Sequence, residues 1–147
     1  MTPLYPKARH LHAGDHALSV ELGDSISPEI NCRVRGLLFA IEKRGIQGVV
    51  DLVPAYRSIL VYYDPSVLNL PDLEAHLREL EEESVDSPVE KSKVIELPTV
   101  YGGEYGPDLG EVATHNGLTP DAVIEIHSNA DYLVYMTGFT PAFPYLG

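Results

Sequence analysis

The residues of this sequence that could take part in chemistry begin with a glycine-rich segment. Tyr101-Gly102-Gly103 is followed by Glu104 and, after a further glycine and a proline, by Asp108. A glycine-rich loop that opens a helix can bring backbone N–H groups close to an anion, and the helix dipole favours negative charge there. The segment has no lysine, however, and it matches neither the P-loop nor the dinucleotide fingerprint. A plain turn is therefore favoured over a phosphate site.

The histidines and the single cysteine do not indicate a metal centre. Six histidines are scattered without the spacing that places two ligands on one metal, although His10, His12 and His16 lie close together in the chain. His127 ends an expected helix, so a general-acid role stands beside the ordinary role of a histidine that favours the helix dipole. Cys32 has no second thiol to pair with and is expected to be buried. We predict no metal site and assign no catalytic residue.

Charge and composition exclude several classes of protein. The chain has 147 residues, of which 44% are hydrophobic and 22% charged, as in ordinary globular domains. Its formal net charge of -12 disfavours nucleic acid and anionic membrane surfaces as partners. Residues 72–90 hold eight carboxylates and one arginine, which predicts a solvated helix face, with an acidic docking surface as the alternative. No signal peptide or membrane span is expected, so we predict a cytoplasmic protein.

A strand and a helix are predicted at the start of the chain. Residues 16–22 alternate between apolar and polar side chains, as a half-buried strand does. Ser27 can cap a helix, Pro28 suits its first position because its missing N–H is not needed there, and Gly45 can end it in a left-handed conformation.

Further strands and a second helix complete a first domain. Short β-branched and aromatic runs at 49–53 and 59–63 predict a hairpin, and a last strand is expected at about 94–100. The second helix is predicted from leucines at helical spacing, Leu70, Leu73, Leu77 and Leu80. The order βαββαβ predicts an α+β, ferredoxin-like domain over residues 1–93, closed by that last strand.

Two short helices are predicted beyond residue 100. The first follows the glycine-rich loop, with Asp108 and Glu111 in a capping-box arrangement and Gly117 at its end. The second starts at Thr119-Pro120 and runs to about His127.

Residues 101–147 are therefore expected to begin a second domain. A strand is predicted at 132–136, and the aromatic, proline-punctuated segment 138–147 follows. One strand and two helices cannot close a core of their own. We expect the chain to be truncated inside this domain, with self-association through 132–147 because an uncovered apolar edge invites pairing.

Two motifs in the second half resemble a known family. They are YGGEYGPDL at 101–109 and GFTPAFPYLG at 138–147, with supporting matches that include 48–58 and 132–136. The family comprises allophanate hydrolase subunit 1, the B subunit of 5-oxoprolinase and the sporulation kinase A inhibitor. Ala142 departs from the pattern, because the family usually has glycine there. A backbone conformation that needs positive φ is therefore expected to be altered at this position.

The resemblance implies an N-terminal α/β domain followed by the incomplete start of a cyclophilin-like β-barrel. It also implies a subunit, inactive alone, of an ATP-dependent amide-hydrolysing complex. That complex would be a 5-oxoprolinase, which opens 5-oxoproline to glutamate with a second cyclophilin-like subunit and a further subunit. ATP would be used by the complex, whether or not this subunit contacts it. The alternatives are a binding protein that inhibits a sensor histidine kinase and an allophanate hydrolase-type subunit.

Candidate residues for binding substrate or a partner come from the two motifs and from the helix end. They are Tyr101, Gly102, Gly103, His127, Phe139, Pro141, Phe143 and Tyr145. In the binding-protein alternative, Phe139, Phe143 and Tyr145 would act as aromatic anchors. The other interpretation of these aromatic side chains is that they fill the core of the barrel.

Overall fold

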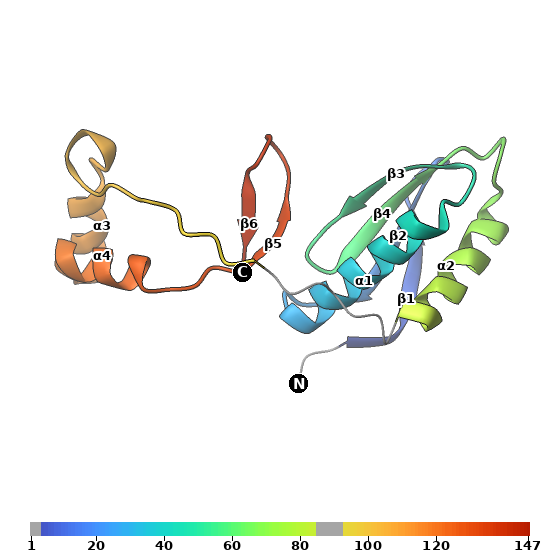
Figure 1. Cartoon of the computed structure of the whole chain (residues 1–147), viewed down its shortest axis with the longest axis horizontal. Coiled ribbons are helices and arrows are strands. Elements are labelled where there is room, and N and C mark those ends of the chain that lie inside the picture. The colour runs from blue at the N-terminus through green and yellow to red at the C-terminus, as the bar shows by residue number, and fades with distance from the viewer. Residues whose placement is uncertain (1–3, 85–92) are drawn as a thin grey trace. The chain divides into compact units, whose positions relative to one another are not determined.

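The computed structural model describes residues 4–84 and 93–147 (Figure 1). The chain divides into two compact units, Met1–Glu90 with Leu133–Gly147, and Lys91–Tyr132. No helix in the described part of the chain is long and apolar enough to cross a membrane.

A four-stranded antiparallel sheet and two helices form the main body of the first unit (Figure 1). Its elements in chain order are β1 (Leu4–His12), β2 (Ala17–Gly23), α1 (Pro28–Arg44), β3 (Val49–Pro54), β4 (Ser58–Tyr63) and α2 (Leu70–Ser84). The strands lie in the order β1-β2-β4-β3. Alternate residues of β2 and β4 share one core with the apolar stripes of both helices, which confirms the α+β class.

The ends of α1 confirm the predicted signals. The Ser27 hydroxyl accepts hydrogen bonds from the backbone N–H groups of Glu29 and Ile30, and Pro28 occupies the first turn. Gly45 has a φ of 60° and donates its N–H to the carbonyl of Ile41. The leucine stripe of α2 is also confirmed, since Leu73, Leu77 and Leu80 are buried.

The strand expected at about 94–100 is not formed. Residues 93–100 adopt neither helix nor strand, and Val94, Ile95 and Leu97 are exposed. The edge beside β2 is taken by β1, which the sequence pattern did not predict. A loop of four residues joins β1 to β2, so this pairing closes at a small entropic cost. The observed element order is therefore ββαββα.

Polar contacts from both helices hold β1 against the unit. The backbone N–H of Ala8 donates to Glu81 Oε1 at 2.7 Å, and Arg33 donates to the carbonyl of Tyr5 at 2.8 Å. Arg33 and Glu81 also form an ion pair at 3.0 Å, with side chains only 21% and 13% exposed. The expectation that the acidic run is a solvated face is thus wrong for Glu81.

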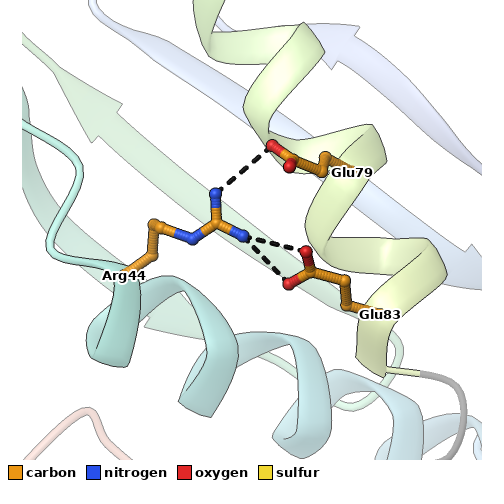
Figure 2. Close-up of polar contacts among 3 residues, drawn as sticks. All are labelled: Arg44, Glu79 and Glu83. Atoms are coloured by element: carbon orange, nitrogen blue, oxygen red, sulfur yellow. Dashed lines mark hydrogen bonds and ion pairs between the residues drawn. The ribbon is translucent and has the colours of Figure 1, made fainter.

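A second set of ion pairs joins the C-terminal ends of α1 and α2. Figure 2 shows the Arg44 guanidinium between two carboxylates of α2, with nitrogen–oxygen distances of 3.3 Å to Glu79 and 2.9 Å to Glu83. These groups are exposed, so they orient the helices more than they stabilise them. Residues 85–90 of the acidic run lie outside the described residues.

His10 on β1 makes the stability of the first unit depend on pH. Its buried Nδ1 has no hydrogen-bond partner among residues 4–84 and 93–147. Burial, followed by the charge of Arg78, lowers the pKa of His10 below 6.5 against the opposing effects of Glu74 and Glu81. The folded state therefore favours the neutral imidazole. We expect the free energy of unfolding to fall as pH decreases through 6.5 towards the folded-state pKa.

Comparison with His10→Gln isolates this contribution, because the other histidines are retained. Denaturant unfolding at several pH values between 7 and 5 should show a smaller loss of stability for the variant. Equal losses in the two proteins would rule out His10 as the source.

Cys32 corrects another expectation, because it is exposed on α1. The buried positions of this helix include Ile30, Val34, Leu37 and Ile41. Cys32 lies about 200° from Ile30 around the helix axis and therefore falls outside that stripe.

The second unit contains two short helices, α3 (Leu109–Asn116) and α4 (Pro120–Ser128), after a 3₁₀ turn at Gly103–Tyr105. Gly117 ends α3 in a left-handed conformation and the Thr119 hydroxyl caps α4, as predicted. The capping box at Asp108 is wrong. Asp108 has helical dihedral angles and makes no capping bond, since a capping side chain needs an extended backbone.

The remaining strands, β5 (Val134–Thr137) and β6 (Pro144–Leu146), pair as an antiparallel hairpin. β5 confirms the strand expected at 132–136, shifted towards the C-terminus. The structure groups residues 133–147 with the first unit, while the domain boundary near residue 100 stays a prediction.

Ala142 in the hairpin loop has a φ of 62°, so the positive-φ conformation that was expected to be altered here is retained. A left-handed conformation is unfavourable for alanine by about 1–2 kcal/mol, so we expect Ala142→Gly to stabilise the hairpin by about 1 kcal/mol. The Gly138 N–H donates to the Phe143 carbonyl at 3.1 Å, so its hydrogen-exchange protection measures the stability of the hairpin. Ala142→Val should have the opposite effect, and equal protection in both variants would contradict the prediction.

Candidate functional site

An aromatic surface in the first unit joins the hairpin to the β3–β4 loop. We define it by Tyr56, Tyr135, Phe139, Phe143 and Tyr145. The Tyr56 ring lies 5.2 Å from that of Tyr135 and 6.2 Å from that of Tyr145, measured between centroids. Its hydroxyl donates to the carbonyl of Leu146 at 2.8 Å. One side chain of the β3–β4 loop thus contacts both strands of the hairpin.

The loop that carries Tyr56 is fixed from several sides. Buried Asn31 of α1 donates its side-chain amide to the Tyr56 carbonyl at 3.3 Å. Arg57 donates to the carbonyl of Gly23 at 2.9 Å, and the Ala55 N–H donates to the Ser58 carbonyl at 2.8 Å. The loop therefore presents the Tyr56 ring to the hairpin in a defined position.

The aromatic surface continues from Tyr145 towards solvent. Phe143 lies 5.5 Å from Tyr145 and 6.2 Å from Phe139, in edge-to-face geometries. Phe139 is 90% exposed and has a φ of 60°, an unfavourable value for a residue with a side chain. Pro141 is exposed in the same turn. Residues 132–147 carry no charged side chain, although the whole chain has a net charge of -12.

A cluster of two tyrosines and a histidine lies in the second unit. The Tyr101 hydroxyl oxygen is 2.6 Å from His127 Nδ1, and the two rings meet edge to face at 5.7 Å. The Tyr132 ring lies 5.4 Å from the imidazole on a tilted plane, and its hydroxyl donates to the His127 carbonyl at 3.1 Å. We call Tyr101, His127 and Tyr132 the tyrosine–histidine cluster.

Glycines set the shape of the loop that carries Tyr101. Gly102 combines a φ of 72° with a ψ of -174°, a conformation essentially restricted to glycine. Gly103 also has a positive φ, of 58°. A Cβ atom on Gly106 would lie 2.7 Å from the backbone nitrogen of Gly102, so no side chain fits there. Gly102 and Gly103 therefore determine the backbone that follows Tyr101.

The structure brings the candidate residues together within each unit. Tyr101 contacts His127 in the second unit. In the first unit the Phe143 ring contacts the rings of Phe139 and Tyr145. Sequence reasoning missed Tyr56, Tyr132 and Tyr135 as members of these groups. The family-like segments 48–58 and 132–136 contain all three, and that resemblance was the available signal.

The chemistry of the candidate residues limits which cofactors they can hold. Across residues 4–84 and 93–147, no three or more His, Cys, Asp or Glu side chains gather closely enough to hold a metal ion. The loop from Gly102 to Asp108 carries two carboxylates and no basic side chain, so it does not fit a nucleoside triphosphate. The tyrosine–histidine cluster beside this loop suits hydrogen bonding and aromatic contact instead.

The chain belongs to a family of carboxyltransferase-type domains. The model of the family described as carboxyltransferase domain, subdomain C and D, matches residues 8–147. Among curated proteins, the chain is 38% identical to the B subunit of 5-oxoprolinase from Bacillus subtilis (strain 168), over 91% of this chain and 60% of that protein. It is 36% identical to the B subunit of 5-oxoprolinase from Escherichia coli O157:H7, over 96% of this chain and 63% of that protein. The chain thus spans about three fifths of these relatives.

Solved structures agree with this family. A conserved uncharacterized protein from Pyrococcus horikoshii is 48% identical, with a TM-score of 0.51 over 95% of this chain and 63% of that one. The protein TTHA0988 is 36% identical, with a TM-score of 0.75 over 88% of this chain and 25% of that one. Urea carboxylase of Kluyveromyces lactis, at 19% identity and a TM-score of 0.63 over 96% of this chain and 15% of that one, shares the fold.

Proposed function

We propose that this chain acts as a subunit of an amide-hydrolysing complex of the 5-oxoprolinase type and is inactive alone. The observation that carries the proposal is the 38% identity, over 91% of the chain, to a protein named as the B subunit of 5-oxoprolinase. The proposed reaction opens the ring amide of 5-oxoproline to give glutamate. The proposed partners are a second cyclophilin-like subunit and a further subunit.

The chemistry of an amide explains why such a complex would use ATP. Resonance gives the C–N bond partial double-bond character, so the amide carbon is a poor target for water. Phosphorylation of the amide oxygen would remove that resonance, so that water can add to the carbon, the ring nitrogen can leave as an amine, and hydrolysis of the resulting acyl phosphate can give glutamate and phosphate. Because the glycine-rich loop of this chain does not fit a triphosphate, we assign ATP binding to another subunit of the complex.

The candidate residues of the two units are proposed to have different roles. The proposed substrate contacts are Tyr101, Gly102, Gly103 and His127, because the Tyr101 hydroxyl and the His127 imidazole suit a polar ligand. Phe139, Pro141, Phe143 and Tyr145 are proposed to contact a partner subunit. The exposure of Phe139 and the uncharged segment around it favour an apolar protein contact.

Reconstitution with the partner subunits tests the proposal. The protein would be purified with the products of its neighbouring genes, and glutamate formed from 5-oxoproline would be measured with and without ATP. We expect glutamate only from the complete mixture with ATP. Phe139→Ala should weaken assembly of the complex, whereas Val50→Ala, at another exposed apolar position, should not.

Other outcomes separate the alternatives. Turnover by this chain alone would contradict its proposed dependence on partners. If the complete mixture is inactive and a sensor histidine kinase co-purifies with the protein, the inhibitor alternative replaces the metabolic one. Hydrolysis of allophanate instead of 5-oxoproline would indicate an allophanate hydrolase-type subunit.

A further inference from the structure

The tyrosine–histidine cluster fixes an imidazole at the surface of the second unit. His127 is held through Nδ1 by the Tyr101 hydroxyl, while its ring meets both tyrosine rings. Tyr132 also binds the His127 backbone carbonyl, so the histidine is restrained at side chain and main chain. His127 is nevertheless exposed, and Tyr132 is 48% exposed. A ligand can therefore reach the imidazole without a rearrangement of the cluster.

The chemistry of the two groups determines which one donates. A phenol is a better hydrogen-bond donor than a neutral imidazole, and an imidazole nitrogen is a better acceptor than a phenol oxygen. The Tyr101 hydroxyl therefore donates to Nδ1. A neutral histidine with Nδ1 as acceptor carries its proton on Nε2. The cluster thus presents one fixed N–H donor at Nε2.

The charge around His127 limits the kind of ligand. The histidine lies in the last turn of α4, where the helix dipole places partial negative charge on the free carbonyl groups. Glu125 and Asp131 add carboxylates nearby in the chain, within a protein of net charge -12. These charges disfavour an anion at Nε2. A neutral acceptor such as an amide carbonyl avoids this repulsion.

We propose that the tyrosine–histidine cluster binds an uncharged amide, with the Nε2–H of His127 donating to the carbonyl oxygen and the exposed Tyr132 ring packing against the amide plane. Tyr101 acts as a positioning residue, because it works through the tautomer and orientation of His127. The inference deepens the proposed function, on which it rests for the identity of the amide: the ring amide of 5-oxoproline is an uncharged amide, and the carboxylate of 5-oxoproline would lie away from Nε2.

Titration of the isotopically labelled 147-residue chain with 2-pyrrolidinone tests the inference. This probe keeps the cyclic amide of 5-oxoproline and lacks its carboxylate. We expect millimolar 2-pyrrolidinone to shift the His127 ring signals, whereas acetate should not. In the free protein, long-range ¹H–¹⁵N correlations should show the Nε2–H tautomer.

Variants separate the positioning role from a general loss of structure. Tyr101→Phe keeps the ring and removes the hydroxyl. It should weaken 2-pyrrolidinone binding about fivefold and reduce the NMR signature of the Nε2–H tautomer of His127. His127→Phe should abolish the binding. Tyr105→Phe, at an exposed tyrosine of the same loop, serves as the matched control and should change neither.

Each contrary result has a defined meaning. A response to acetate equal to that to 2-pyrrolidinone, or binding retained in His127→Phe, would overturn the inference. A tautomer unchanged by Tyr101→Phe would remove the positioning role. Binding of 2-pyrrolidinone at His127, together with a reconstituted complex inactive on 5-oxoproline, would refute the proposed function and leave the amide site standing.

Discussion

Replacing Tyr56 with alanine is expected to release the β5–β6 hairpin from the rest of the first unit. The substitution removes two ring contacts, with Tyr135 and Tyr145, and the hydrogen bond to the Leu146 carbonyl. We expect a loss of about 2–3 kcal/mol in the free energy that holds the hairpin in place, less than for a fully buried aromatic side chain. Hydrogen exchange of the hairpin amides measures this loss.

Tyr56→Phe is the matched control, because it retains the ring contacts and removes only the hydroxyl. Its expected effect is about 1 kcal/mol. In both variants the amides of β2 and β4 should keep their protection, since the core beneath the helices is unchanged. Equal protection of the hairpin in Tyr56→Ala and the parent chain would show that other contacts hold it.

The second large effect is expected for Glu81→Ala. The substitution leaves the partly buried Arg33 guanidinium without its ion-pair partner and the Ala8 N–H without its acceptor. We expect the free energy of unfolding to fall by about 2–3 kcal/mol, below the value for a fully buried pair because both side chains retain some contact with water. Denaturant unfolding at pH 7 and low salt measures it.

Two further variants test the assignment to Glu81. Glu81→Gln keeps an oxygen for the Ala8 N–H and removes the charge, so its loss should be intermediate. Glu79→Ala removes an exposed partner of Arg44 on the same helix and should have a much smaller effect. The burial argument would be wrong if Glu79→Ala were as destabilising as Glu81→Ala.

The parts of the fold predictable from sequence were those with local causes. The ends of α1 at Ser27 and Gly45 and the buried leucines of α2 follow from capping groups and helical spacing, and the structure has them where expected. The β-branched and apolar residues of segment 94–100 favour a strand. A strand also needs a partner, and intrinsic preference cannot supply one.

The candidate site was predictable only in part. A motif and a helix end indicate Tyr101 and His127 as candidates, but their contact spans 26 positions of sequence. The role of Tyr56 depends on a hydrogen bond across 90 positions. Such contacts arise from tertiary packing, which residue type and periodicity do not encode.

The placement of β1 has a practical consequence for dissecting the protein. Among the described residues this strand pairs only with β2, and it is held from the side by Glu81 and Arg33. A chain lacking residues 4–12 would present β2 as an open edge with an unfilled row of hydrogen-bonding groups. A synthetic peptide with the sequence of residues 4–12 could then pair with this open edge of β2. Binding of the peptide would report that the remaining unit has folded, so the sheet is suited to a split reporter.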